Sequence, residues 1–191
     1  MKTEATKQKI QETFFSLSQT MPMKKITVSK LCQACQISRS TFYLHYDNVD
    51  DLTEYLEKEL LYRIEKLLKR TAYSSGRISK SDLFHLLTYI DSHLSEFQFL
   101  ISKQDSAEFI ARLSNIIENS LTNRLQVLGY HIETYKLAIS FAASGILNLM
   151  ISQIKQNLPE TKQMICFTYN ELIYAILKHK VKTSSTILLV F

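Results

Sequence analysis

Residues 23–46 read MKKITVSKLCQACQISRSTFYLHY, and this stretch decides the fold of the N-terminal part of the chain. Thr27 is a good N-cap residue and predicts a helix from Val28 to about Cys35. Ser38 is the next good N-cap and opens a second short helix from Arg39 to about Leu44. Two short helices joined by about three residues are typical of a helix-turn-helix.

The apolar side chains of this stretch are spaced so that they can form a small core. They are Leu31, Cys35, Ile37, Phe42 and Tyr46. That core leaves Arg39, Ser40, Tyr43 and His45 facing outward. An Arg at the start of such a helix can bind guanine in the major groove with its forked guanidinium. Hydroxyl and free N–H groups at a helix start can bind phosphate. The stretch therefore predicts a DNA-reading surface.

The rest of the chain is also expected to be helical. It holds only three Gly and two Pro among 191 residues, whereas strands are joined by turns that depend on both. Upstream of the motif, Ile10, Phe14 and Leu17 repeat with a helical period and predict a helix from about Thr3 to Gln19. We therefore expect an all-α fold that opens with a three-helix helix-turn-helix domain over residues 1–47.

Residues 26–52, ITVSKLCQACQISRSTFYLHYDNVDDL, resemble the helix-turn-helix signature of the TetR/AcrR family of bacterial transcriptional regulators. The shared features are Thr-Val, Ile-Ser, Thr-hydrophobe-Tyr-x-His-aromatic, and a Leu six residues beyond that aromatic. The resemblance implies phosphate contacts from Thr27, Thr41, Tyr43 and His45. It also implies base-edge or groove contacts from Arg39, Ser40 and Leu44, with Leu44 against a thymine methyl group. Lys25 and Ser38 complete the expected DNA-binding set.

Two positions depart from the family pattern. Gln36 stands in the turn where the family often has Gly, and it must take a backbone conformation that Gly takes more easily. Val49 stands where a Lys often contacts phosphate, so one phosphate contact is in doubt. Lys24, Lys25 and Lys30 are the candidates to replace it.

Charge is concentrated at the N-terminus. Residues 1–47 hold seven basic and three acidic residues, so they carry +4 of the chain's net charge of +5. A basic region beside a nearly neutral body suggests binding to a polyanion, although a solvated surface has the same composition.

Cys32 and Cys35 form a C-x-x-C motif inside the predicted helix-turn-helix. The family usually has Ala at these positions, so we interpret both as small buried packing residues. A thiol switch and a metal site are the alternatives, but no second Cys or His pair follows at zinc-finger spacing. The sequence therefore predicts no metal and no cofactor.

The remaining residues, 48–191, are expected to form a second helical domain. Asn48 can cap a fourth helix, residues 71–79 resemble a linker, and further helices are predicted at about 80–101, 106–128, 132–157 and 160–179. About nine helices are expected in total. The region resembles, more weakly, the C-terminal domain of one branch of the same family. That resemblance implies effector binding and dimerisation through the last two long helices.

The predicted helix at 132–157 is apolar nearly all round, so it must be covered on two sides. We expect one side to face its own core and the other to face a second copy. A fully internal helix of a monomer is the alternative. The expected dimer interface consists of Ala138, Ala142, Gly145, Leu149, Leu172 and Ile176.

An effector pocket is harder to place. His85, Tyr89, His93 and Phe97 are spaced by four and could line a cavity, although ordinary half-buried packing has the same spacing. The candidate pocket residues are Tyr62, His85, Tyr89, His93 and Phe141.

The sequence thus predicts a dimeric transcriptional regulator, in the first instance a repressor, that binds a palindromic DNA operator and responds to a small-molecule effector. The alternative is a TetR-like coactivator or structural DNA-associated protein that acts mainly through a protein partner. An enzyme is not expected, because the three Gly are too far apart for a phosphate-binding loop and no catalytic set is recognisable. No secretory signal and no apolar stretch of membrane-spanning length are expected, so the predicted location is cytoplasmic.

Overall fold

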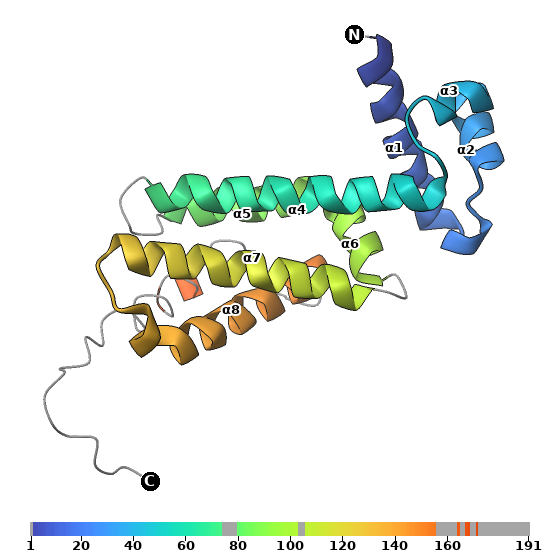
Figure 1. Cartoon of the computed structure of the whole chain (residues 1–191). Coiled ribbons are helices and arrows are strands. Elements are labelled where there is room, and N and C mark those ends of the chain that lie inside the picture. Colours follow the sequence, from blue (N-terminus) through green and yellow to red (C-terminus); the bar gives the residue numbers. More distant parts are fainter. Residues whose placement is uncertain are drawn as a thin grey trace, which may run out of the picture.

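The computed structural model describes residues 2–73, 80–102 and 106–155, together with Met164, Phe167, Thr168 and Glu171. Within these residues the chain forms eight α-helices and one turn of 3-10 helix, and it contains no strand (Figure 1). The predicted all-α class is confirmed. The predicted helix at 160–179 cannot be compared, because it falls almost wholly outside the described residues.

The first helices make a small head at one end of the molecule. They are α1 (Lys2–Thr20), the 3-10 turn η1 (Met23–Lys25), α2 (Val28–Cys35) and α3 (Arg39–Tyr43). Both α2 and α3 lie within one residue of the predicted bounds. Phe14 of α1, Leu31 of α2 and Phe42 of α3 are fully buried in the head core.

Side-chain caps begin α2, α3 and the long helix that follows the head where the sequence predicts them. Thr27 Oγ1 accepts a hydrogen bond from the Lys30 N–H at 3.4 Å, and Ser38 Oγ accepts one from the Thr41 N–H at 3.0 Å. Asn48 Oδ1 accepts the Asp51 N–H at 2.9 Å. Each cap satisfies a backbone donor that has no partner inside its own helix.

The turn between α2 and α3 depends on one residue. Gln36 has φ +55°, the left-handed conformation, as its place in the turn predicts. Its N–H donates to the Gln33 carbonyl at 3.2 Å, and the Ile37 N–H donates to the Cys32 carbonyl at 3.0 Å. This pair of bonds ends α2 and turns the chain so that α3 begins at once.

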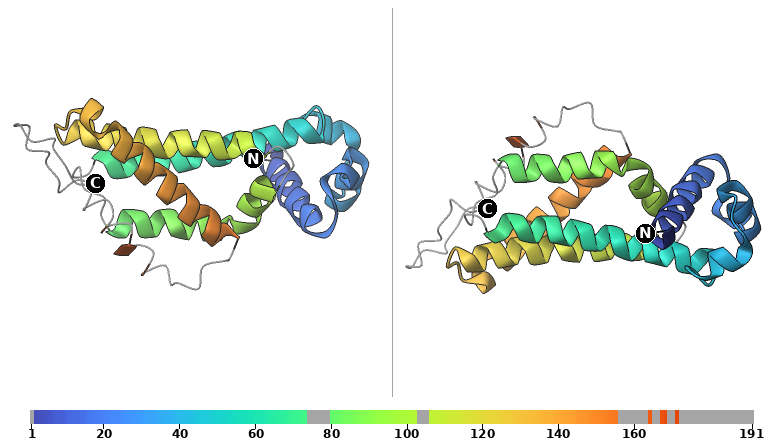
Figure 2. Two further views of the ribbon diagram at one scale, coloured as in Figure 1. Left: turned by 90° about the horizontal axis from the view of Figure 1, so that it is seen from below. Right: turned by 90° about the horizontal axis from the view of Figure 1, so that it is seen from above.

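Among the described residues, the body contains five helices: α4 (Val49–Tyr73), α5 (Lys80–Ser92), α6 (Leu94–Ser102), α7 (Ser106–Val127) and α8 (Ile132–Ile154). The long α4 runs from the head along the whole body, and α7 lies beside it (Figure 1). The helix α8 packs on α7 and crosses the body obliquely in both views of Figure 2. The short α6 joins the body to the head, because it contacts α1 as well as α7 and α8.

The single helix predicted at about 80–101 is wrong, because the structure breaks it at His93. The side chains explain the break. Ser92 Oγ donates to the Tyr89 carbonyl at 2.9 Å, and His93 Nδ1 lies 3.0 Å from the same oxygen. The backbone N–H of His93 bonds instead to the Ile90 carbonyl at 3.2 Å. Local side-chain bonds thus compete with the helical ladder and redirect the chain.

Aromatic rings join the head to the body. The Phe99 ring of α6 lies 5.2 Å from the Phe14 ring and 6.2 Å from the Phe15 ring, both edge to face. The Lys7 ammonium of α1 lies 3.9 Å from the centre of the Tyr55 ring of α4. The position of the head is therefore set by contacts with both α4 and α6.

The expectation about membrane-spanning length is wrong for α8. By length and composition alone this helix could cross a membrane, with a mean hydropathy of 1.6. Core helices pass the same test, and α8 buries Tyr135, Ile139, Ala143 and Met150 against its own chain. Its apolar composition is thus accounted for in part by internal packing.

The left-handed turn gives a test of the fold. Replacing Gln36 with Gly removes a conformational strain of about 1–2 kcal/mol and adds a chain-entropy cost of about 0.4–1 kcal/mol, so we expect a gain of about 0.5 kcal/mol. The control is Gly129→Ala. Gly129 also has a left-handed φ, +77°, with no atom within 4 Å of an added Cβ, so strain alone should lower stability. Urea unfolding measures both changes, and a loss of stability in Gln36→Gly would contradict the strain argument.

Candidate nucleic-acid interface

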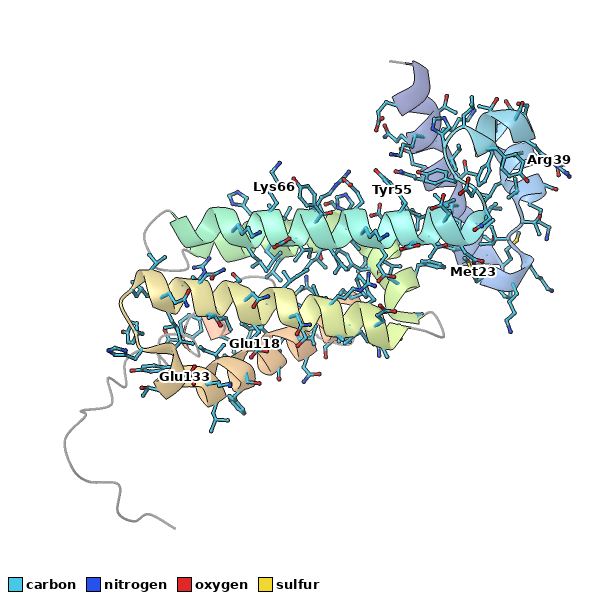
Figure 3. All side chains as sticks on the ribbon, in the orientation of Figure 1. Met23, Arg39, Tyr55, Lys66, Glu118 and Glu133 are labelled. Atoms are coloured by element: carbon cyan, nitrogen blue, oxygen red, sulfur yellow. The ribbon has the colours of Figure 1, made fainter. Side chains whose placement is uncertain are left out.

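Arg39, the first residue of α3, lies at the outer edge of the head, far from the body (Figure 3). Its side chain is exposed, and its Nη2 donates to Ser29 Oγ of α2 at 2.5 Å. In the part of the chain that is described, this is the only hydrogen bond of the guanidinium. The remaining donors can bind a ligand, as the predicted guanine contact requires.

Three hydroxyl groups gather at the start of α3. Ser38 Oγ lies 2.7 Å from Ser40 Oγ and 2.8 Å from Thr41 Oγ1. Ser38 and Ser40 are exposed and Thr41 is half-buried. The predicted grouping of Ser38, Ser40 and Thr41 beside Arg39 is therefore present in the structure.

The end of α3 exposes apolar surface. Leu44 is 80% exposed and Tyr43 is 54% exposed, whereas the preceding residue, Phe42, is fully buried. His45 is half-buried beside Tyr46. An exposed Leu next to an exposed Tyr suits a surface that is covered when a partner binds, and a thymine methyl is one such partner.

The predicted phosphate-binding lysines lie on other segments. Lys24 and Lys25 are exposed on η1, and Lys30 is exposed on α2. In Figure 3, Met23 of η1 and Arg39 lie at different edges of the head. Val49 is half-buried against the head core.

Cys32 and Cys35 lie inside the head. Their relative exposures are 5% and 0%, and each thiol lies 3.8 Å from a backbone carbonyl, that of Ser38 and that of Lys9. Burial raises the pKa of the Cys32 thiol above its ordinary value, the nearby Cys35 raises it further, and Arg39 opposes them. Within the described chain, no cluster of three potential ligands could hold a metal ion.

Three of the five candidate effector residues are exposed to solvent. Tyr62 is 58% and Phe141 is 76% exposed, and His85 is also exposed. Tyr89 and His93 do lie together, with ring centres 4.2 Å apart. The prediction of a common pocket stays a prediction.

Tyr89 and His93 belong to a polar cluster where α4, α5 and α6 meet. Burial raises the pKa of Tyr89 to about 12, with the Arg63 charge opposing the shift. Burial also raises the pKa of Glu96, while His93 and Arg63 act to lower it. Ionisable groups from three helices thus influence one another here.

A separate groove lies between the head and the body and was not predicted. Its volume is about 970 Å³, and its walls come from α1, η1, α4, α6 and α7. They include Met23, Glu57, Phe99 and Arg112, and none of the five candidate effector residues. Glu57 is buried, and its Oε1 lies 3.5 Å from Nη1 of Arg112. Sequence reasoning missed this groove because its residues are scattered over several helices and show no common spacing.

The candidate dimer residues lie along α8, except for Leu172 and Ile176, which fall outside the described residues. Ala138, Ala142 and Leu149 are half-buried and Gly145 is exposed. The most exposed apolar side chains of α8 are Leu137, at 87%, and Phe141 one turn later. Sequence reasoning did not assign these two to an interface, because an evenly apolar helix does not reveal which side faces outward.

Comparison with known proteins places the fold. The helical head and body share their fold with a solved structure, the dihydroxyacetone kinase operon activator DhaS, with a TM-score of 0.70 and 20% identity. The match covers 91% of this chain and 96% of DhaS. No family model and no curated protein matches the chain.

The two buried thiols give a test of the packing interpretation. In a Cys166→Ala background, we expect Cys32 and Cys35 to react slowly with iodoacetamide at pH 7.5, because both side chains are buried away from the reagent. Full reactivity should return in denaturant, which serves as the control. Replacing both thiols with Ala should lower the free energy of unfolding by about 1–3 kcal/mol through lost packing. Rapid labelling of the folded protein, or a Cys32–Cys35 disulfide after mild peroxide, would instead support a thiol switch.

Proposed function

We propose that this protein is a dimeric DNA-binding transcriptional regulator that recognises a palindromic operator through α3. The observation that carries the proposal is the outer face of the head, where Arg39, Ser40, Tyr43 and Leu44 are exposed together on and just after one short helix. A fold shared with DhaS, which is named as an operon activator, supports a role in transcription. The proposal includes a cytoplasmic location and no enzymatic activity.

The surface charge of the head supports binding to DNA. Within the described residues, the Lys and Arg side chains between residues 4 and 47 form no ion pair. Their charges stay available for phosphate, and release of counterions from DNA would favour the complex. Basic residues that were neutralised by neighbouring carboxylates would not give this effect.

Dimerisation through α8 is the second part of the proposal. Leu137 and Phe141 expose two large apolar side chains one turn apart, which suits burial against a second copy. A symmetric dimer would place its two α3 helices in successive major grooves, about 34–36 Å apart or a small multiple of that distance. A palindromic operator follows from that symmetry.

The direction of regulation is proposed as repression, because a dimer lying across two major grooves occludes its site. Activation through a protein partner is the opposite outcome. A reporter gene behind the protein's own operator distinguishes them, since loss of the protein should raise expression under repression and lower it under activation.

Response to a small-molecule effector is also proposed. Two places could receive it, the Tyr89–His93 cluster and the groove of about 970 Å³. Both include or adjoin α6, which contacts α1 of the head, so a ligand at either place can shift the recognition helix. An effector that moves α6 when it binds would change the affinity of the protein for its operator.

The first test separates base reading from phosphate binding. Arg39→Ala should weaken operator binding by about 1–3 kcal/mol and relax the preference at one base pair in each half-site. Lys25→Ala is the matched control, and it should weaken operator and random DNA alike and reduce the salt dependence. Fluorescence anisotropy with both DNAs, over a range of salt concentrations, measures these effects. If Arg39→Ala weakens both DNAs equally, Arg39 is a phosphate ligand.

The second test concerns the dimer. Phe141→Asp places a charge on the exposed face of α8, where it should leave the monomer fold intact and prevent association. Ala142→Asp is less suitable, because Ala142 packs partly against its own core. Tyr62→Asp is the control, since Tyr62 is similarly exposed on α4.

Sedimentation velocity and circular dichroism should show folded monomers for Phe141→Asp only, with a collapse of operator affinity. A parent protein that is monomeric, and that binds one half-site as tightly as the whole palindrome, would contradict the dimer.

A further inference from the structure

One hydrogen bond joins the two helices of the helix-turn-helix on their outer surface. Arg39 Nη2 donates to Ser29 Oγ at 2.5 Å, and the two residues are ten positions apart. Ser29 is the second residue of α2, and Arg39 is the first residue of α3. The left-handed turn at Gln36 redirects the chain between them, and the Arg39 side chain reaches back to the second residue of α2.

The other hydroxyl groups near Arg39 are engaged elsewhere. Ser40 and Thr41 both lie within 2.8 Å of Ser38 Oγ, on the same helix as Arg39. Ser29 is therefore the hydroxyl that fixes the guanidinium from the neighbouring helix. No described carboxylate pairs with Arg39, so its charge is held in place without being neutralised.

We propose that Ser29 is a positioning residue that orients the Arg39 guanidinium for base recognition, which rests on the proposed function of α3 as a DNA-reading helix. An unrestrained Arg side chain loses several rotamers when it binds a base edge. A side chain that is already ordered by one hydrogen bond loses fewer, and the guanidinium keeps four N–H donors for DNA. Because Ser29 is uncharged, it contributes to base discrimination and adds nothing to the attraction for phosphate.

The experiment compares Ser29→Ala, which removes the hydroxyl, with Ser29→Thr, which keeps it. Gln33→Ala, an exposed change one turn further along α2, is the control for damage to that helix. Each full-length protein is titrated with three DNAs: a selected operator, the operator altered at the base pair that Arg39→Ala identifies, and random DNA. The discrimination ratio is the affinity for the first DNA divided by that for the second.

We expect Ser29→Ala to lower the discrimination ratio about two- to tenfold, the range of one lost hydrogen bond, with binding to random DNA unchanged. Ser29→Thr and Gln33→Ala should keep the ratio of the parent protein. In an Arg39→Ala background, Ser29→Ala should have no further effect, because its action passes through the guanidinium.

Several results would overturn the inference. They are an unchanged ratio in Ser29→Ala, an equal loss on all three DNAs, or an additional loss in the Arg39→Ala background. An equal loss on all DNAs would make Ser29 a phosphate contact. A parent protein that binds no DNA with sequence preference would overturn the proposed function itself, and that result is visible before any variant is compared.

Discussion

The helices α1 to α3 are too small to bury their apolar side chains by themselves, and the rest of the architecture depends on how that core is completed. Small domains bury only a limited share of their surface. Here Leu52 and Leu56 of α4 enter the head core, and Phe99 of α6 packs against Phe14 and Phe15. The head core is therefore completed by residues of α4 and α6, whereas the body has a second core cluster of its own.

The contacts that α6 makes with both head and body have a mechanical consequence. The helix α6 contacts α1 on one side and α7 and α8 on the other, so it can transmit a displacement between them. Its N-terminal end is set by the break at His93, where side chains occupy the Tyr89 carbonyl. Gln98 of α6 also donates from Nε2 to the Ile154 carbonyl, the last residue of α8, at 2.9 Å. The end of α8 and the Tyr89–His93 cluster are thus both connected to the head by the same short helix.

The features predicted well from the sequence are those that depend on neighbouring residues. The caps at Thr27, Ser38 and Asn48 and the strained turn at Gln36 are local, because each is decided within about four positions of the chain. These caps locate α2, α3 and the start of α4 within a residue or two.

Other features depend on distant parts of the chain and were not predictable in the same way. The groove is lined by residues from five separate elements, and no spacing relates them. The outward face of α8 depends on where α7 lies. The apolar composition of α8 could therefore show that two sides of the helix need to be covered, but it could not show which side faces its own core. The break at His93 is local, but it depends on the orientation of two side chains, the Ser92 hydroxyl and the His93 imidazole, rather than on residue type alone. Fold class and the two helices of the helix-turn-helix were therefore within reach of the sequence, whereas the groove was not.

The distribution of ion pairs distinguishes the two ends of the molecule. The body pairs its charges along its own helices: Glu54 with Lys58, Glu59 with Arg63, Glu65 with Lys69, and Glu108 with Arg112, each four residues apart. Such pairs contribute little to stability at a surface, but they leave the body nearly neutral. The head holds its excess of positive charge with no such pairing among its described side chains, and its Arg39 is fixed by a neutral hydroxyl. A carboxylate at position 29 would hold that guanidinium more strongly and would also repel phosphate. The serine keeps the guanidinium in place while its charge stays available, which is the combination that a DNA-reading surface requires.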